Sequence, residues 1–371
     1  MNASDFDFDL PDELIAQEPP AVRGESRLLA LNRHTGDIRD GTFAQLVDRL
    51  ASGDLLVLNN TRVFPARLLG RRVPSAGAVE FLLVRQLPTP NVPDSNETQS
   101  SIGSSDVGVG KSSYWEALVH PGQKLKPGAL VEFGHDTLRL HAEILGRHYH
   151  GRRTVRLWTA DGSDVSAAID QLGHVPLPPY IRREDRASDR ERYQTVYARA
   201  RGSIAAPTAG LHFTRALLEQ LDARGIERTE ITLHVGYGTF KPVRADAIED
   251  HVVDPEAFTV SGDAAAALTR ARHEGRRVIA VGTTTTRALE SLQIDAGGGV
   301  VPATGETQLF IRPGHEFRVV QGMITNFHLP RSSLLMLVAA FAGREQALAA
   351  YRHAVERRYR FYSYGDAMMI L

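Results

Sequence analysis

Two histidines lie in glycine-containing turns that are separated by one expected helix. His212 follows a run of small residues that includes Gly210, and His234 opens the run His-Val-Gly-Tyr-Gly-Thr-Phe. Each turn follows an expected strand, and open α/β sheets bind ligands at the carboxyl ends of their strands. Because a histidine titrates near neutral pH, either residue could transfer a proton in a reaction. The alternative is that each one is a hydrogen-bonded residue of the core.

The segment between the two histidines carries the signals of a helix. Thr214 is of a type that caps the amino end of a helix, and Gly225 is of a type that ends one. The apolar residues between them recur near helical spacing, at Ala216, Leu217, Leu221 and Ala223. We therefore expect one short helix that connects the two turns.

A threonine-rich turn forms a third candidate site. Gly282 and four threonines follow the apolar run 277–281 and precede an expected helix. Free backbone N–H groups and hydroxyls at such a turn could hold an anion, and Arg287 would add positive charge. The turn lacks the glycine spacing of a dinucleotide site and the lysine of a Walker loop. Its alternative role is simply to begin a helix.

Composition excludes several kinds of chemistry and indicates a cytoplasmic protein. The 371 residues include no cysteine, which rules out disulfides, thiolate nucleophiles, cysteine-ligated zinc and iron–sulfur clusters. The acidic start lacks the basic and apolar regions of a secretion signal. The longest apolar run, 334–342, is too short to span a bilayer, and we expect it to form a buried helix. A net charge of −1 means that any nucleic-acid site must be a local patch.

The order of expected elements indicates an α/β main domain that is interrupted by a small antiparallel β-barrel. The main domain, residues 1–63 and 163–371, alternates helices with strands around a layered sheet. The inserted domain, residues 64–162, shows no convincing helix. Its six strand-like runs are 66–73, 79–87, 114–119, 129–133, 138–145 and 154–159, a spacing typical of a small barrel. Residues 88–113 are rich in Pro, Ser, Gly and Asn, and we expect a disordered loop there.

Several longer blocks resemble the motifs of a known family. They are the block Ala-Pro-Thr-Ala-Gly-Leu-His-Phe-Thr that ends at Thr214, residues 233–240, 325–330 and 361–369, and, near the start, residues 10–19, 26–29 and 53–63. Together they span nearly the whole chain in the family's order. On these blocks the chain resembles the S-adenosylmethionine:tRNA ribosyltransferase-isomerases of queuosine biosynthesis. It departs from the family's pattern at Asn60, Val253, Asp254 and Glu306, where other residues are usual.

The resemblance implies a specific reaction. The ribosyl group of S-adenosylmethionine is transferred to a 7-aminomethyl-7-deazaguanine base in the wobble position of a tRNA, adenine and methionine leave, and epoxyqueuosine remains. S-Adenosylmethionine is then a cosubstrate, and we expect no metal and no permanently bound cofactor. Because the sulfonium acidifies the ribose C5′ protons, the implied reaction needs one base and one acid. We predict that His212, His234 and Asp366 are catalytic, with His328 and Glu80 as further candidates.

The same reading assigns binding residues. We expect aromatic faces and turn residues to bind S-adenosylmethionine, namely Thr208, Gly210, Phe213, Gly236, Tyr237, Gly238, Thr239, Phe240, Thr283, Thr284 and Arg287. We expect tRNA to contact Arg62, Lys241, Asn326, His328, Arg357 and Arg358. The two last arginines belong to a basic, aromatic segment that could instead be a solvated amphipathic helix. The chain is expected to act as a monomer.

Two other functions remain open from the sequence. One is a non-catalytic RNA-binding protein of the same fold. The other is a tRNA methyltransferase, although the glycine-rich first turn and acidic strand end of such enzymes are not obvious in this chain.

Overall fold

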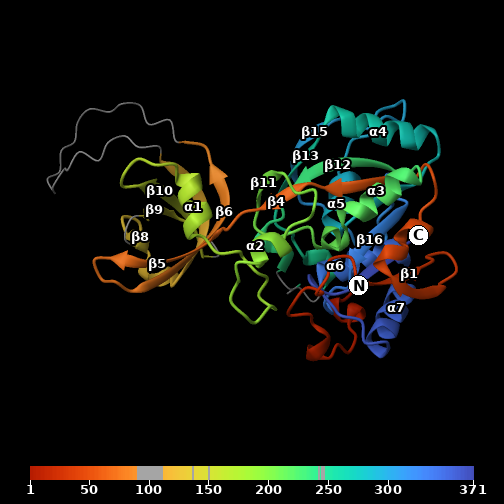
Figure 1. Ribbon diagram of the computed structural model, residues 1–371, viewed down its shortest axis with the longest axis horizontal. Helices are drawn as coiled ribbons and strands as arrows, with labels where there is room; N and C mark the ends of the chain where they lie inside the picture. Colours follow the sequence, from red (N-terminus) through yellow and green to blue (C-terminus); the bar gives the residue numbers. More distant parts are fainter. Residues whose placement is uncertain (90–111, 136–137, 149–150, 241–242, 244–246) are drawn as a thin grey trace. The chain divides into compact units, whose positions relative to one another are not determined.

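The structure, a computed structural model, describes residues 1–89, 112–135, 138–148, 151–240, 243 and 247–371 (Figure 1). The chain forms two compact units, residues 1–63 with 177–371, and residues 64–176. Most of the loop expected at 88–113 lies outside the described residues. The second unit extends beyond residue 162, because helix α1 (Val165–Leu172) packs on strands of the barrel.

The larger unit is built on a nine-stranded mixed sheet in the order β15-β13-β12-β3-β14-β16-β17-β1-β2. The strands are β1 Arg27–Leu31, β2 Ile38–Thr42, β3 Leu55–Asn59, β12 Glu227–Leu233, β13 Glu256–Val260, β14 Val278–Val281, β15 Ala303–Thr307, β16 Gly322–Asn326 and β17 Ala367–Ile370. The neighbours β12, β3, β14 and β16 are parallel, so their carboxyl ends lie at one edge. The expected layered α/β domain is confirmed.

Helices cover both faces of this sheet, which explains why its central strands are apolar along their whole length. Leu55 and Val57 of β3 face the core that α4 to α7 complete, whereas Leu56 and Leu58 face the core that α3 completes. The helices are α2 Asp189–Arg192, α3 Arg215–Ala223, α4 Gly262–His273, α5 Thr283–Glu290, α6 Ser333–Ala342 and α7 Arg344–Glu356. The expected buried helix at 334–342 is therefore confirmed as α6.

Local signals set the ends of the helices that flank the expected sites. The side chain of Thr214 caps α3 by accepting a hydrogen bond from the Leu217 N–H at 3.0 Å. Gly225 follows α3 with φ +77°, which only glycine adopts without strain. Gly282 joins β14 to α5 with φ +98°. The two expected helices after His212 and after Gly282 are thus present.

A separate two-stranded sheet lies outside the nine-stranded one. It pairs β4 (Thr61–Val63) with β11 (Ala200–Ser203) in parallel. The small-residue run before His212 therefore does not continue a strand of the main sheet. It leads from β11 into a short 3₁₀ helix, residues 208–212.

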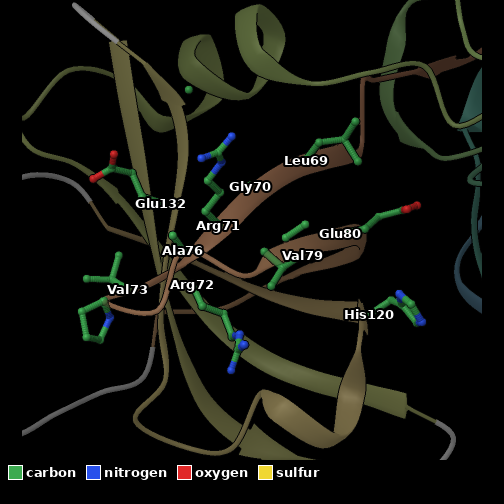
Figure 2. Close-up of a pocket in the computed structure, with 13 residues that line it drawn as sticks. Leu69, Gly70, Arg71, Arg72, Val73, Ala76, Val79, Glu80, His120 and Glu132 are labelled. Atoms are coloured by element: carbon green, nitrogen blue, oxygen red, sulfur yellow. The ribbon is translucent and has the colours of Figure 1, made fainter.

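The second unit contains a closed barrel in the order β10-β7-β6-β5-β8-β9, as the six strand-like runs predicted. Its strands are β5 Arg67–Val73, β6 Ala78–Leu87, β7 Ser113–His120, β8 Leu130–His135, β9 Leu138–Arg147 and β10 Arg152–Thr159. Alternate residues such as Phe81, Phe133 and Leu157 fill the interior. A pocket of about 660 Å³ lies on this unit. Figure 2 shows its lining residues, which include residues of β5, Glu80 and His120.

Among the described residues, no single helix is long and apolar enough to cross a membrane, and α6 and α7 reach that length only as a pair bent by 116°. In the same part of the chain, no group of three or more potential metal-ligating side chains is present.

Candidate functional site

A pocket lies at the carboxyl ends of β14 and β16, and we call it the central pocket. It is lined by Tyr180, Ala205, Ala206, Pro207, Thr208, Ala209, Val235, Gly282, Thr283, Thr284, Thr325, Asn326, His328, Leu334, Tyr362 and Ser363. Several segments of the described chain meet here, and three of them lie at or after the ends of the parallel strands β12, β14 and β16, whose carboxyl ends share one edge of the sheet. The pocket therefore combines hydroxyls, one amide and one imidazole with apolar walls.

The central pocket unites residues that the sequence analysis had assigned to different ligands. Thr208, Thr283 and Thr284 were predicted to bind S-adenosylmethionine, whereas Asn326 and His328 were predicted to contact tRNA. Asn326 and His328 are both almost fully buried. Their position means that only a group inserted into the pocket can reach them, so they do not contribute to an exposed RNA-binding surface.

His328 is an uncharged imidazole at neutral pH. Its Nε2 lies 2.9 Å from the Thr325 hydroxyl, and its backbone N–H donates to the Tyr351 hydroxyl at 3.1 Å. Burial lowers the pKa of His328 to about 3. A neutral imidazole can accept a proton, and this one lies in the wall of the pocket.

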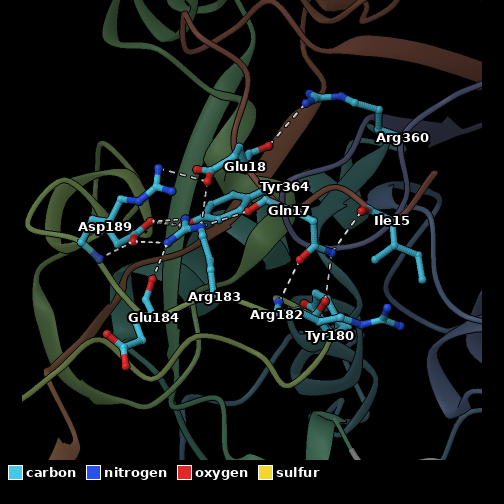
Figure 3. Close-up of polar contacts among 11 residues, drawn as sticks. Ile15, Gln17, Glu18, Tyr180, Arg182, Arg183, Glu184, Asp189, Arg360 and Tyr364 are labelled. Carbon is cyan, nitrogen blue, oxygen red and sulfur yellow. Dashed lines mark hydrogen bonds and ion pairs between the residues drawn. The ribbon is translucent and has the colours of Figure 1, made fainter. Parts of the chain in front are cut away.

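A tyrosine wall closes the central pocket, and the sequence analysis did not identify it. The Tyr180 and Tyr362 rings meet edge to face with their centroids 3.7 Å apart, and the Tyr180 hydroxyl hydrogen-bonds to that of Ser363. Gln17 holds the Tyr180 segment, because its amide donates to the Tyr180 carbonyl at 3.0 Å and accepts from the Arg182 N–H at 2.8 Å (Figure 3). Burial raises the pKa of Tyr180, so its hydroxyl stays protonated.

A buried ion pair supports this wall. Asp189 accepts two hydrogen bonds from the Arg183 guanidinium, at 2.7 and 2.9 Å, and one from the Tyr364 hydroxyl at 3.0 Å (Figure 3). Glu18 lies 2.9 Å from the Arg183 Nε. These contacts connect Glu18, Arg183 and Tyr364. Arg183 and Tyr364 are close in sequence to Tyr180 and Ser363 of the wall.

His212 lies in a second small pocket that shares Ser363 with the central one. The ring is almost fully buried, and its Nδ1 lies 2.8 Å from the Ser26 hydroxyl. Among the described residues, its Nε2 and the Oδ1 of Asn326 have no hydrogen-bond partner. Burial lowers the pKa of His212 to about 4, although nearby Asn326 acts in the opposite direction. This histidine is thus neutral at physiological pH and does not itself line the central pocket.

His234 does not line either of these pockets. Val235, the next residue, lines the central pocket, and successive side chains of an extended chain point to opposite sides. The His234 Nδ1 lies 2.8 Å from the Thr61 hydroxyl, and burial lowers its pKa. A Cβ at Gly202 would come within 2.6 Å of its ring. The structure therefore does not bring His212 and His234, both predicted as catalytic, into one of these pockets.

Three other predicted residues have structural partners. The Asp366 carboxylate accepts the backbone N–H groups of Arg27 at 2.9 Å and Arg360 at 2.8 Å and lines none of the described pockets. Phe213 is fully buried in the core under α3. Gly210 packs against Tyr197, whose hydroxyl would lie 2.2 Å from an added Cβ. In this structure, none of the three is placed to touch a ligand in the central pocket.

Arg287 lines a further pocket, which we call the arginine pocket. The walls of this pocket are Gly238, Val253, Asp254, Glu256, Arg287, Leu309, Phe310, Ile311, Ser333, Leu334 and Leu337. Leu334 also lines the central pocket. The Arg287 Nη1 donates to Glu256 at 2.6 Å, and the Gly236 N–H donates to the same carboxylate at 3.1 Å. We expected Arg287 to add its charge to the threonine-rich turn. In the structure, Arg287 pairs with Glu256 and lines the arginine pocket, whereas Thr283 and Thr284 line the central pocket.

The remaining predicted residues lie elsewhere. Arg62, Arg357 and Arg358 are exposed, and Glu80 forms an ion pair with Arg67 at 2.7 Å in the barrel unit. Tyr237 is partly buried. Lys241 and the side chains of Thr239 and Phe240 lie outside the described residues.

Comparisons with known proteins identify the family of this chain. Residues 3–370 match the family described as "Queuosine biosynthesis protein". The S-adenosylmethionine:tRNA ribosyltransferase-isomerase of Heliobacterium modesticaldum is 49% identical over 371 residues and covers 100% of both chains. The enzyme of the same name from an Anaeromyxobacter species is 49% identical over 370 residues, covering 100% of this chain and 99% of its own.

A solved structure is similar as well. The crystal structure of S-adenosylmethionine tRNA ribosyltransferase from Thermotoga maritima is 37% identical, covers 99% of this chain and 100% of its own, and aligns with a TM-score of 0.52. The fold, the full-length match and the identities agree, so the chain belongs to the S-adenosylmethionine:tRNA ribosyltransferase-isomerase family, whose members are transferases and isomerases of queuosine biosynthesis that modify tRNA.

Proposed function

We propose that this chain transfers and isomerises the ribosyl group of S-adenosylmethionine onto 7-aminomethyl-7-deazaguanine at the tRNA wobble position. The products are epoxyqueuosine in the tRNA, free adenine and free methionine. S-Adenosylmethionine acts as cosubstrate, without a resident metal or cofactor. The reaction takes place in the cytoplasm, and the chain acts as a monomer.

The central pocket carries this proposal. It lies where ligands bind in open α/β sheets. Its walls include residues from four of the blocks on which the family resemblance rests and from the threonine-rich turn. Its Thr208, Thr283 and Thr284 hydroxyls suit a ribose, and its tyrosine wall offers aromatic faces to a sulfonium. We place the ribosyl part of the cosubstrate here.

Neutral imidazoles suit the first step of the reaction. A base must remove a proton from C5′, next to the sulfonium, before adenine and methionine leave. His328 lines the central pocket and is neutral at physiological pH, as a base must be before it takes up a proton. Because a pKa of about 3 makes an imidazole a weak base, this role requires that the bound cosubstrate raise the pKa of His328 toward neutrality. His212, predicted as catalytic from the sequence, lines the neighbouring pocket that shares Ser363. We therefore place His328 first and keep His212 as the second candidate for proton transfer.

For His234 and Asp366, the partners described above favour a supporting role. His234 is held between Thr61 and Gly202, and Asp366 fixes two backbone N–H groups. The exposed residues Arg62, Arg357 and Arg358 remain available to tRNA phosphates.

Product analysis tests the proposal against its alternatives. The full-length protein is incubated with S-adenosylmethionine and a tRNA that carries the aminomethyl-deazaguanine, and the small products are separated by chromatography. We expect adenine and methionine in equal amounts, only when this tRNA is present. S-Adenosylhomocysteine would indicate a methyltransferase, and tRNA binding without any product would indicate a non-catalytic RNA-binding protein.

A further inference from the structure

The arginine pocket contains a buried cationic group that its protein partners leave unsatisfied. Arg287 is buried, its Nε donates to the Leu309 carbonyl at 3.0 Å, and its Nη1 donates to Glu256. Its Nη2 has no hydrogen-bond partner among the residues that the structure describes. A buried donor without a partner is costly, so an acceptor is expected when the site is filled.

Glu256 keeps this guanidinium in place. One of its carboxylate oxygens accepts from Arg287 at 2.6 Å, and the other accepts from the Gly236 N–H at 3.1 Å. The pair joins α5 to the start of β13 and to the turn after β12. Because Glu256 uses one side of the guanidinium, Nη2 is left to bind a group that enters the pocket.

The other walls define the chemistry of that group. Asp254 supplies a second carboxylate, and Leu309, Phe310 and Leu337 supply apolar surface. The described lining residues thus carry one guanidinium and two carboxylates, a net negative charge. An α-amino acid end on a short apolar chain matches this set, because its carboxylate can accept from Nη2 while its ammonium faces Asp254.

The position of the pocket connects it to the central one. Leu334, at the start of α6, lines both pockets. A ligand with its ribose in the central pocket and its sulfonium near Leu334 would direct its amino acid end toward Arg287. The net positive charge of S-adenosylmethionine also suits the negative charge of the lining.

We infer that the arginine pocket binds the methionine end of S-adenosylmethionine, with the Arg287 Nη2 on its α-carboxylate and Asp254 on its α-ammonium. This inference rests on the proposed function and extends it by assigning a subsite.

A pair of ligands that differ only in the amino acid end tests this assignment. S-Adenosylhomocysteine and 5′-methylthioadenosine share the nucleoside and a neutral thioether, and only the first carries the amino acid. Their affinities are measured by calorimetry for the wild-type chain and for the double variant Arg287→Met with Glu256→Gln. The double change removes both charges, so neither is left buried without its partner.

We expect the double variant to bind S-adenosylhomocysteine about 10- to 100-fold more weakly, the range for a lost hydrogen bond between charged groups. Affinity for 5′-methylthioadenosine should stay within about twofold, since this ligand makes no contact in the arginine pocket. Arg312→Met is the matched control, because Arg312 also pairs with a glutamate, Glu249, but at the surface. It should change neither affinity.

A second variant keeps the test decisive if the double variant does not fold. Asp254→Asn, at a partly exposed position, should weaken S-adenosylhomocysteine alone, by about fivefold. Equal losses for both ligands, or no loss for either, would overturn the assignment while leaving the proposed function intact. If the wild-type chain bound neither ligand, the assignment would be overturned as well, whereas failure of the proposed function would show separately, as the absence of adenine and methionine in the product analysis.

Discussion

The two neighbouring arginines Arg182 and Arg183 each pair with an aspartate, and we predict very different energies for the two pairs. The Asp189 and Arg183 side chains are 2% and 14% exposed, whereas those of Asp12 and Arg182 are 74% and 73% exposed. Removing one partner of a buried pair costs about 3–5 kcal/mol, because the other charge is left uncompensated. Since Glu18 remains near Arg183, we expect the lower end, about 3 kcal/mol, for Asp189→Asn.

Asp12→Asn is the matched control. It breaks an ion pair of the same chemistry at 3.0 Å, but exposed pairs contribute only about 0–1 kcal/mol. The free energy of unfolding of the larger unit is read from urea-dependent hydrogen exchange of the buried amides of β3. Tryptophan fluorescence would not serve, because both tryptophans, Trp115 and Trp158, belong to the barrel unit.

The pH dependence gives a second check on the same pair. Burial by itself would raise the pKa of Asp189, but hydrogen bonds from Arg183, the Arg186 N–H and Tyr364 lower it overall. A carboxyl whose pKa is lower in the folded state stabilises the protein above its unfolded pKa, about 4, and loses this contribution as the pH falls. The difference between wild type and Asp189→Asn should therefore shrink below about pH 4. Similar losses for Asp189→Asn and Asp12→Asn, or a difference that grows in acid, would refute this reasoning.

Further predictions concern the histidines and one helix cap. His328→Gln should lower kcat by about 10²- to 10⁴-fold in steady-state kinetics, while calorimetry should find its affinity for S-adenosylmethionine within a few fold of wild type. His212→Gln should show the same loss of kcat only if His212 also transfers a proton. Burial lowers the pKa of His212 to about 4 in the folded protein, so the unfolded chain binds a proton at this residue more readily. The free energy of unfolding should therefore decrease as the pH is lowered from about 6.5 to 4, and the decrease should be smaller in His212→Gln. Thr214→Ala should cost about 1 kcal/mol in urea unfolding, because it removes the α3 cap, and an unchanged midpoint would contradict that role. Gly202→Ala should displace His234 from Thr61, which an altered imidazole NMR signal would report, whereas an unchanged signal would show that the ring does not pack there.

Local patterns in the sequence were sufficient for much of the fold. The cap at Thr214, the stop at Gly225 and the apolar run before Gly282 each act through a few neighbouring residues, so the helices α3 and α5 could be predicted. The regular spacing of six short runs likewise predicted the barrel. The place of helix α1 with the barrel unit was missed, because it depends on contacts with β9 and β10 rather than on its own sequence.

The site was harder to predict because it depends on contacts between distant segments. The segment around His234 does reach the central pocket, but through Val235 rather than His234. Which of the two residues lines the pocket depends on the direction of each side chain at the strand end. Tyr180 reaches the pocket only because Gln17 holds its segment from 163 positions away. The one available signal was that Ser363 and Gln17 belong to blocks that resemble the family's motifs.

The origin of the ribosyl carbons tests the central claim most directly. S-Adenosylmethionine with all five ribose carbons labelled by carbon-13 is incubated with the full-length chain and a tRNA that carries 7-aminomethyl-7-deazaguanine, and the nucleosides of the digested tRNA are analysed by mass spectrometry. Our account predicts that all five labelled carbons appear together in the wobble nucleoside and that the released adenine is unlabelled. A tRNA without labelled carbons, or one whose mass increases only by an unlabelled methyl group, would contradict the account.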